Sequence, residues 1–370
     1  MSVRYIGPCM DASGYANAVR NNIAAMARCG IDFTVSTIRF ETSMSNHGTL
    51  SKIVNSYINR PIKFNKQIIH CTPENWGKLI HTDKYNIGYT TWETDKLPKD
   101  WPGLINQVDE VWVPSTWNKD VFESSGVTKP IYVIPHAIDE TILKQNMVEN
   151  FGIDRNLYNF YSIFQWTERK NPECLIESFL EEFSSEENVQ LVLKTYNMGW
   201  DLKQQSIVKE KIRAIKAKVN KNNPPKLMFI GNLLSASEIA SVHNSCDCFV
   251  LPHRGEGFGI PIAEAMHFEN LTISTDWSGS KEFCNEKNSL LIDYKLVPVT
   301  GMPWGKYTTD QNWAEPNKST LKKLMRSAFE KTKKNDLLRK EGKVSIVNKC
   351  SFETIGNKIK ERLDKIDETI

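Results

Sequence analysis

The 370-residue sequence lacks several features that would each define a class of protein. Its eight cysteines are scattered and include no Cys-x-x-Cys pair, which argues against a zinc site or a disulfide framework and favours a reducing compartment. The N-terminus has no basic-then-apolar signal peptide pattern, and no run approaches the roughly 18 apolar residues of a membrane span. We therefore expect a cytoplasmic protein.

A strong charge of one sign is also absent. The net charge of +3 gives no overall nucleic-acid-binding signature, although it allows a local basic site for a diphosphate. The sequence contains no Asp-x-Asp motif, no internal repeat and no low-complexity tract. We therefore expect no nucleic-acid partner and no metal cofactor.

What is present is an alternation of short apolar runs with helical stretches, the pattern of an α/β protein with parallel sheets and helices on both faces. The first half contains strand candidates at residues 3–6, 33–38, 67–70, 86–90, 110–113 and 131–134. The second half contains candidates at residues 160–164, 189–194, 227–230, 247–251, 271–274 and 290–292. Two sheets are implied, and a domain size of about 100 to 200 residues agrees with two domains.

The polar stretch at residues 138–159 is the expected boundary between the sheets. We predict an N-terminal domain at residues 1–145 and a C-terminal domain at residues 146–348. In the C-terminal segment 349–370 we predict a last helix from Ser351 onward, with Ser351 as its N-cap and Ile355, Ile359, Leu363 and Ile366 on one stripe.

The segment Gly255-Glu256-Gly257-Phe258-Gly259-Ile260-Pro261 is the most informative part of the chain. It follows the apolar strand candidate 247–251 and opens a helix, because Pro261 fits the first helical turn. The amides of Phe258, Gly259 and Ile260 would then point at whatever lies before the helix, which is a site for an anion. Gly257 and Gly259 permit backbone conformations and close approaches that a side chain would prevent.

Glu256 and Glu264 lie eight positions apart across this turn. The spacing resembles the Glu-x7-Glu signature of the retaining family-4 glycosyltransferases. The resemblance implies the GT-B fold, with two facing Rossmann-like domains and a C-terminal helix that returns to the N-terminal domain. It also implies that Glu256 attends the donor sugar and that Glu264 binds the ribose of the nucleotide.

Two further loops resemble segments of that family. Gly14, in Asp11-Ala12-Ser13-Gly14, resembles the first glycine loop and implies a backbone contact with the donor phosphates. Arg169 and Lys170 lie in a loop after the strand candidate 160–164 and resemble the family's basic loop. Two adjacent cations there would neutralise the leaving diphosphate. An ordinary turn and a solvated charge pair are the alternative interpretations.

Two residues of the first half are candidates for contact with the sugar or the acceptor. Glu93 stands where the family often has a histidine that faces the donor sugar, and the alternative is an acid near a helix N-terminus. His70 ends another strand candidate and is a weaker prediction, because a lone histidine is more often structural. Ser115 and Asn118 are expected to cap a helix.

We therefore expect a retaining glycosyltransferase that moves a hexose-like sugar from a UDP- or GDP-sugar to a hydroxyl of a carbohydrate, lipid-linked or protein acceptor. The predicted catalytic residues are Glu93, Lys170, Arg169 and Glu256. The lysine-rich helix around residues 207–221 adds the option of peripheral membrane contact, and a solvated outer helix is the alternative.

Four other functions share features with the sequence. A nucleotide-sugar epimerase of the same fold and a non-catalytic sugar-nucleotide binding protein both stay open. A glycoside hydrolase is disfavoured, since its two carboxylates would flank the scissile bond rather than come from one loop and its helix. A dinucleotide dehydrogenase is disfavoured because the run from Gly257 to Ile262 lacks the third glycine of Gly-x-Gly-x-x-Gly.

Overall fold

The computed structural model describes residues 2–39, 49–141, 151–303, 305–330 and 332–369. The chain forms two compact units. The first consists of residues 1–141, 256–260 and 346–370, and the second of residues 142–255 and 261–345. The predicted boundary between residues 145 and 146 lies outside the described residues.

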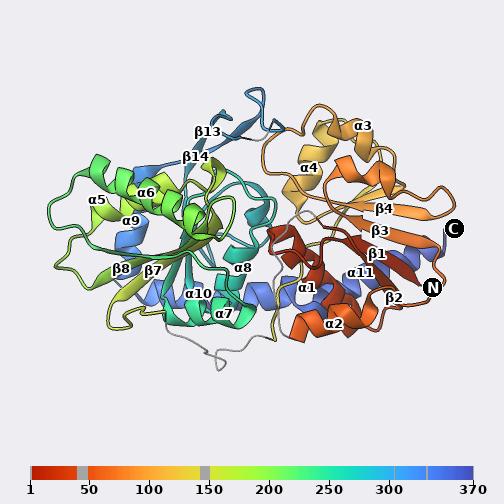
Figure 1. The fold of residues 1–370 in the computed structure, drawn as a ribbon, viewed down its shortest axis with the longest axis horizontal. Coiled ribbons are helices and arrows are strands. Elements are labelled where there is room, and N and C mark those ends of the chain that lie inside the picture. Colours follow the sequence, from red (N-terminus) through yellow and green to blue (C-terminus); the bar gives the residue numbers. More distant parts are fainter. Residues whose placement is uncertain (1, 40–48, 142–150, 304, 331, 370) are drawn as a thin grey trace. The chain divides into compact units, whose positions relative to one another are not determined.

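The first unit contains a six-stranded parallel sheet in the order β2-β1-β3-β4-β5-β6 (Figure 1). All six strands predicted for the first half of the chain are confirmed. Their bounds are β1 (Val3–Gly7), β2 (Phe33–Thr37), β3 (Lys66–His70), β4 (Tyr85–Tyr89), β5 (Glu110–Val113) and β6 (Ile131–Val133).

The second unit contains another six-stranded parallel sheet, in the order β12-β11-β10-β7-β8-β9. Its strands match the six predicted ones and are β7 (Tyr158–Gln165), β8 (Val189–Tyr196), β9 (Lys226–Ile230), β10 (Cys248–Leu251), β11 (Leu271–Thr275) and β12 (Leu290–Ile292). An antiparallel pair, β13 (Tyr294–Pro298) and β14 (Asn312–Pro316), was not predicted. The predicted α/β class with two parallel sheets is confirmed.

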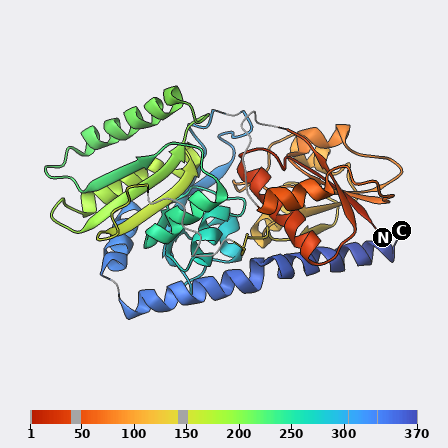
Figure 2. The ribbon, with the colours of Figure 1, turned by 60° about the horizontal axis from the view of Figure 1, so that its bottom comes forward.

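Helices flank both sheets. The first unit has α1 (Gly14–Arg28), α2 (Thr49–Tyr57), η1 (Pro73–Lys78), α3 (Trp101–Ile105), α4 (Thr116–Ser124) and α11 (Phe352–Asp367). The second has η2 (Glu168–Lys170), α5 (Pro172–Glu182), α6 (Leu202–Val219), α7 (Ala236–Ser245), α8 (Ile260–His267), η3 (Ser278–Glu282) and α9 (Lys318–Phe329); α10 (Lys333–Cys350) begins there. Figure 2 shows α6 on one face of the second sheet and α7 and α8 on the opposite face. Each sheet is therefore covered on both sides.

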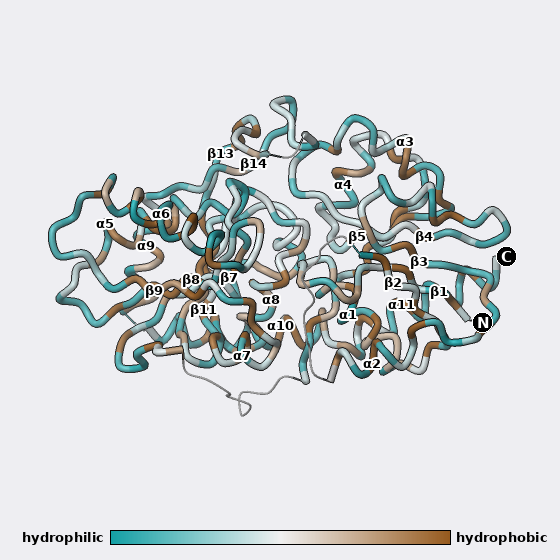
Figure 3. The backbone as a smooth tube through the Cα atoms, viewed as in Figure 1, coloured by the Kyte–Doolittle hydropathy of each residue, from teal (hydrophilic) through white to brown (hydrophobic). Residues whose placement is uncertain are grey.

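Apolar residues gather along the central strands, as the hydropathy colouring of β3, β4, β7 and β8 shows (Figure 3). Continuous apolar strands are expected when helices cover both faces of a parallel sheet. Among the helices of the described residues, none is long and apolar enough to cross a membrane.

Helix α1 is buried along most of its length, and three of its polar side chains hold loops in place. Arg20 Nη1 donates to the carbonyl oxygens of Cys9 and Asp11, at 3.0 and 2.8 Å. Asn21 and Asn22 bond the backbone of Ala137, at 2.9 and 3.0 Å. The loop after β1 and the segment after β6 are thus fixed by one helix.

The predicted C-terminal helix is confirmed as α11. The Ser351 side chain caps it by accepting from Thr354 N, and all four residues of the predicted stripe are buried. Charged contacts also hold the helix to the sheet. Arg362 makes a two-pronged pair with the buried carboxylate of Glu110, at 3.1 and 2.5 Å, and Lys66 pairs with Asp367. The last helix therefore completes the core of the first unit.

Close packing of α11 on α1 generates a stability prediction. A Cβ atom at Gly356 would lie 2.3 Å from the Ala25 carbonyl oxygen and 2.5 Å from Cys29 Sγ, so the two helices would have to separate. We expect Gly356→Ala to destabilise the protein by about 1 to 3 kcal/mol, the usual range for overpacking, and to lower the midpoint of thermal unfolding.

Gly103→Ala is the matched control, because a Cβ at Gly103 in α3 meets no atom within 4 Å. This variant should be neutral or slightly stabilising, since alanine favours the helix. An equal midpoint for Gly356→Ala and wild type would contradict the packing argument.

Candidate functional site

The order of strands in the second sheet gives the position of the candidate site. From β7 the chain proceeds to β8 and β9 on one side, and then returns to β10 on the other side of β7. The carboxyl ends of β7 and β10 therefore flank a topological switch point, where open α/β sheets bind ligands. The loops that leave these ends are the predicted basic loop and the predicted glycine loop.

These two loops are hydrogen-bonded to each other. Arg169 Nη1 donates to the carbonyl oxygen of Gly255 at 2.6 Å, and Arg254 N donates to the carbonyl oxygen of Arg169 at 2.7 Å. Lys170 ends η2 and is only 9% exposed. Asn171 follows with a positive φ of 55°, which turns the chain into α5. The structure thus brings Arg169 and Lys170 to the edge of the sheet where the glycine loop begins.

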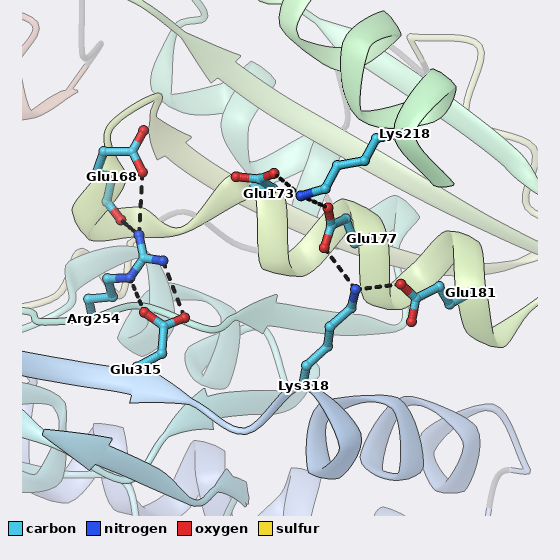
Figure 4. Close-up of polar contacts among 8 residues, drawn as sticks. All are labelled: Glu168, Glu173, Glu177, Glu181, Lys218, Arg254, Glu315 and Lys318. Atoms are coloured by element: carbon cyan, nitrogen blue, oxygen red, sulfur yellow. Dashed lines mark hydrogen bonds and ion pairs between the residues drawn. The ribbon is translucent and has the colours of Figure 1, made fainter. Parts of the chain in front are cut away.

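Sequence reasoning missed Arg254, which organises this edge. Its guanidinium makes a two-pronged pair with Glu315 of β14, at 2.6 and 3.2 Å, and donates to the carbonyl oxygen of Glu168 at 2.7 Å (Figure 4). It also lies 5.4 Å from the ring centroid of Trp313. The only signal in the sequence was its place directly before Gly255 and Glu256.

Helix α5, which follows the basic loop, is anchored by a row of acidic residues. Lys318 Nζ lies 2.7 Å from Glu177, and Lys218 Nζ lies 2.7 Å from both Glu173 and Glu177 (Figure 4). Lys318 also pairs with Glu181. These contacts tie α5 to α6 and α9 and hold in place the helix that follows the basic loop.

The tip of the glycine loop packs within the first unit. Asn118 Nδ2 donates to the Gly257 carbonyl oxygen at 2.7 Å, and Phe258 meets the His136 ring edge-on at a centroid distance of 5.2 Å. A Cβ at Gly257 would lie 2.1 Å from Thr91 Oγ1. The group that approaches Gly257 closely is therefore the side chain of Thr91. Gly259 has a φ of +94°, the left-handed region that favours glycine.

The two glutamates of the motif have different surroundings. Glu256 is buried, with 5% of its surface exposed, at the start of the loop tip. Glu264 lies on α8, 4.0 Å from Nε2 of the buried His243. Burial lowers the pKa of His243 to about 3, so this histidine is neutral and forms no ion pair with Glu264.

A hydrogen-bond chain holds the His243 ring in place. Asn270 Nδ2 donates to Tyr161 Oη at 2.7 Å, and Tyr161 Oη is hydrogen-bonded to His243 Nδ1, also at 2.7 Å. The chain fixes the orientation of the ring, whose Nε2 is the atom nearest the Glu264 carboxylate.

In the first unit, the predicted Gly14 lies at the first position of α1, and a Cβ there would meet no atom within 4 Å. Ser13 caps the helix by accepting from Ala16 N at 3.2 Å. The next residue, Tyr15, bonds Thr90 Oγ1 at 2.9 Å. The first turn of α1 is therefore in contact with the loop after β4.

Glu93 lies half-buried in the loop after β4. Burial, and then the nearby Glu93 carboxylate, raise the pKa of Tyr15, so Glu93 is close to the start of α1. Glu93 does not cap the next helix in the chain, because α3 begins at Trp101 and Asp100 is its N-cap. Ser115 does cap α4, as predicted.

His70 is placed inside the first unit. Its side chain is fully buried, stacks on Tyr89 at a centroid distance of 4.1 Å, and bonds the Tyr5 hydroxyl through Nδ1 at 2.7 Å. Burial, and then His136, hold the pKa of His70 well below its ordinary value. These are the contacts of a core residue, and a role toward sugar or acceptor stays a prediction.

Within the described residues, no group of three or more histidine, cysteine, aspartate or glutamate side chains is arranged to hold a metal ion.

Comparisons with known proteins address both the fold and the second unit. Residues 158–298 match the family model described as glycosyl transferases group 1. No curated protein sequence matches the chain significantly.

Many solved structures share the fold. Sucrose-phosphate synthase from Thermosynechococcus elongatus aligns with a TM-score of 0.72 and 13% identity, over 100% of both chains. HepE from Anabaena, in complex with UDP and glucose, aligns with a TM-score of 0.69 and 13% identity, over 99% of this chain and 100% of that one. A glycosyltransferase from Rickettsia africae aligns with a TM-score of 0.67 and 14% identity, over 99% and 98%. The chain thus has the two-domain GT-B fold, and the part that contains the switch-point loops matches glycosyl transferases group 1.

Proposed function

We propose that this protein is a retaining glycosyltransferase that moves a hexose-like sugar from a nucleoside-diphosphate sugar to an acceptor hydroxyl. The observation that carries the proposal is the pairing of two loops at the switch point of the second sheet. Arg169 and Lys170 lie on the loop after β7. The loop after β10 contains Gly255 and Glu256 and leads into the helix that contains Glu264. Cations, loop amides and carboxylates are the groups that a diphosphate, a ribose and a sugar require.

The comparisons support the same activity. The family match covers the residues that contain both loops. HepE, which has the same fold, was solved with UDP and glucose and with UDP-glucose. A UDP-sugar is therefore the first donor to test, and a GDP-sugar is the second.

The proposed mechanism is electrostatic. Lys170, Arg169 and the amides of Phe258, Gly259 and Ile260 would stabilise the diphosphate as its bond to the sugar breaks and negative charge develops on it. Glu264 would hold the ribose and Glu256 the sugar, and the phosphate contact of Gly14 would come through its backbone. The acceptor hydroxyl would attack the same face of the sugar from which the diphosphate leaves, which retains the anomeric configuration.

Two rival functions make different predictions about turnover. A nucleotide-sugar epimerase would convert the donor with no acceptor present, and a non-catalytic binding protein would bind the donor without changing it. Incubation of a donor sugar with and without a panel of acceptors separates all three, because only a transferase needs both substrates.

The setting and the acceptor side are also part of the proposal. All eight cysteines are free thiols, which supports a reducing compartment such as the cytoplasm. The exposed lysines of α6 support contact with an anionic membrane or a lipid-linked acceptor, because basic helices are attracted to anionic lipid. Carbohydrate and protein acceptors are equally compatible with the site residues.

The ribose role of Glu264 leads to a binding prediction. Glu264→Gln should weaken the binding of UDP or GDP by roughly 1 to 3 kcal/mol, the cost of losing a charged hydrogen-bond partner. The measurement is titration calorimetry, preceded by a thermal-shift screen that identifies the base. Glu286→Gln, at an exposed position of the same unit, is the control and should bind like wild type. Unchanged affinity in Glu264→Gln would remove the ribose assignment.

Glu93 should act on transfer and leave nucleotide binding alone, because the nucleotide is assigned to Glu264, the basic loop and the glycine-loop amides, whereas Glu93 is assigned to the sugar or the acceptor. In Glu93→Gln we expect sugar transfer to fall by about 10²-fold or more, the scale of removing a positioned catalytic group. Binding of the free nucleoside diphosphate should stay at the wild-type level. Glu123→Gln, on the exposed face of α4, is the control. Transfer at the wild-type rate in Glu93→Gln would make Glu93 a structural residue.

Metal independence is the third expectation. If lysine, arginine and the loop amides neutralise the diphosphate, initial rates of transfer should be the same with and without EDTA. A complete loss of activity that magnesium or manganese restores would show that a divalent ion carries this charge.

A further inference from the structure

Lys194 is a buried lysine that none of the assigned roles uses. It lies two residues before the carboxyl end of β8, and only 3% of its surface is exposed. Lysine is almost never this buried unless its charge is paired. The surroundings of its ammonium group therefore require an explanation.

Two aromatic rings are the contacts of this ammonium. Nζ lies 4.3 Å from the ring centroid of Trp200 and 6.0 Å from that of Tyr196, and these two rings stack on each other at 3.8 Å. Among the described residues it meets no carboxylate and no hydrogen-bond acceptor. Burial lowers the pKa of Lys194 to about 7, and no neighbouring charge contributes to the shift.

The end of β8 is joined to the predicted basic loop. Trp166 N donates to the Tyr196 carbonyl oxygen at 2.7 Å, and Gln165 Nε2 donates to the Asn197 carbonyl oxygen at 3.2 Å. Lys194 therefore lies at the carboxyl edge of the strand next to β7, beside the loop that leads to Arg169 and Lys170. This edge is where open α/β sheets bind their ligands.

We propose that Lys194 is a further donor-binding residue, whose ammonium binds an anionic phosphate oxygen of the nucleoside diphosphate. The inference rests on the proposed function, because it assumes a nucleotide sugar at this edge. A buried ammonium without an anionic partner costs stability, and a phosphate oxygen would supply the missing opposite charge. A phosphate fits better than a neutral sugar hydroxyl, because only an anion offsets the burial of the charge.

Proton linkage separates this role from simple packing. Near pH 8, above a pKa of about 7, the amine is mostly neutral in the free protein. A bound phosphate favours the charged form and raises the pKa, so binding should take up a proton from solution. Near pH 6 the amine is already protonated, and the uptake should vanish. Another lysine, Lys211, lies on the exposed side of α6 with its Nζ 5.7 Å from the centroid of the Trp166 ring.

The experiment is titration calorimetry of the full chain with UDP-glucose and with GDP-glucose, in buffers of different ionisation enthalpy at both pH values. These diphosphate diesters lack the terminal phosphate group that titrates near pH 6. His136 and His243, each with a pKa of about 3, are also silent in this range. For wild type we expect an uptake approaching one proton per bound donor near pH 8 and little near pH 6.

Lys194→Met should abolish the proton uptake and weaken donor binding by roughly 10- to 100-fold, the fold-change that corresponds to losing one charged hydrogen bond. Its midpoint of thermal unfolding should equal or exceed that of wild type, because an unpaired buried amine is removed. Lys194→Gln provides the same test with a polar side chain. Lys211→Met, at an exposed lysine that also lies near a ring, is the matched control and should retain both affinity and uptake.

Two outcomes would overturn the role of Lys194 alone, and a third would also overturn the proposed function. Wild-type affinity in both Lys194 variants, or weaker binding with the proton uptake retained, would overturn the role of Lys194 alone. Failure of the wild-type protein to bind either nucleotide sugar would overturn the proposed function together with this inference.

Discussion

The candidate site depends on one electrostatic constraint, which is the crowding of positive charge at the carboxyl ends of β7 and β10. Arg169, Lys170 and Arg254 all lie on the two loops that leave these ends, and like charges so close together repel. The structure offsets this with oxygen atoms. The Gly255 carbonyl accepts from Arg169, and Glu168 and Glu315 accept from Arg254. The unpredicted hairpin partner β14 thus supplies a carboxylate that keeps the basic loop folded.

Regular structure could be predicted from the sequence because its signals are local. Each of the twelve strands of the two sheets is an apolar run of its own, and the C-terminal helix has a cap and a stripe within one segment. The pair β13 and β14 has no such signal, since β13 is largely exposed and its register depends on a strand beyond an intervening loop. The other strands are buried on both faces, so they are apolar throughout and the sequence alone indicates them.

The chemistry of individual side chains was harder to predict, because it depends on partners far away in the sequence. Arg254 meets Glu315, which is 61 positions away, and only folding shows that pairing. His70 had the sequence setting of a strand-end ligand, yet its ring is stacked between buried aromatic neighbours. The sequence does not distinguish Lys194 from an exposed lysine, because only the folded structure shows that it is buried. Glu93 and the two glutamates of the motif were predicted from a family pattern rather than from one residue, and their roles stay predictions.

The placement of α11 has a consequence for how the chain folds during synthesis. Residues 352–367 fill the core of a unit whose sheet comes from the first third of the chain, and α1 packs closely against them at Gly356. A ribosome makes the sheet of the first unit long before it makes this helix. Until then, the apolar surface that α11 covers stays open to water or to a chaperone, while every strand of the second sheet is translated. The second unit ends at residue 345, before α11 is made, so it can reach its final form first although its sheet is made second.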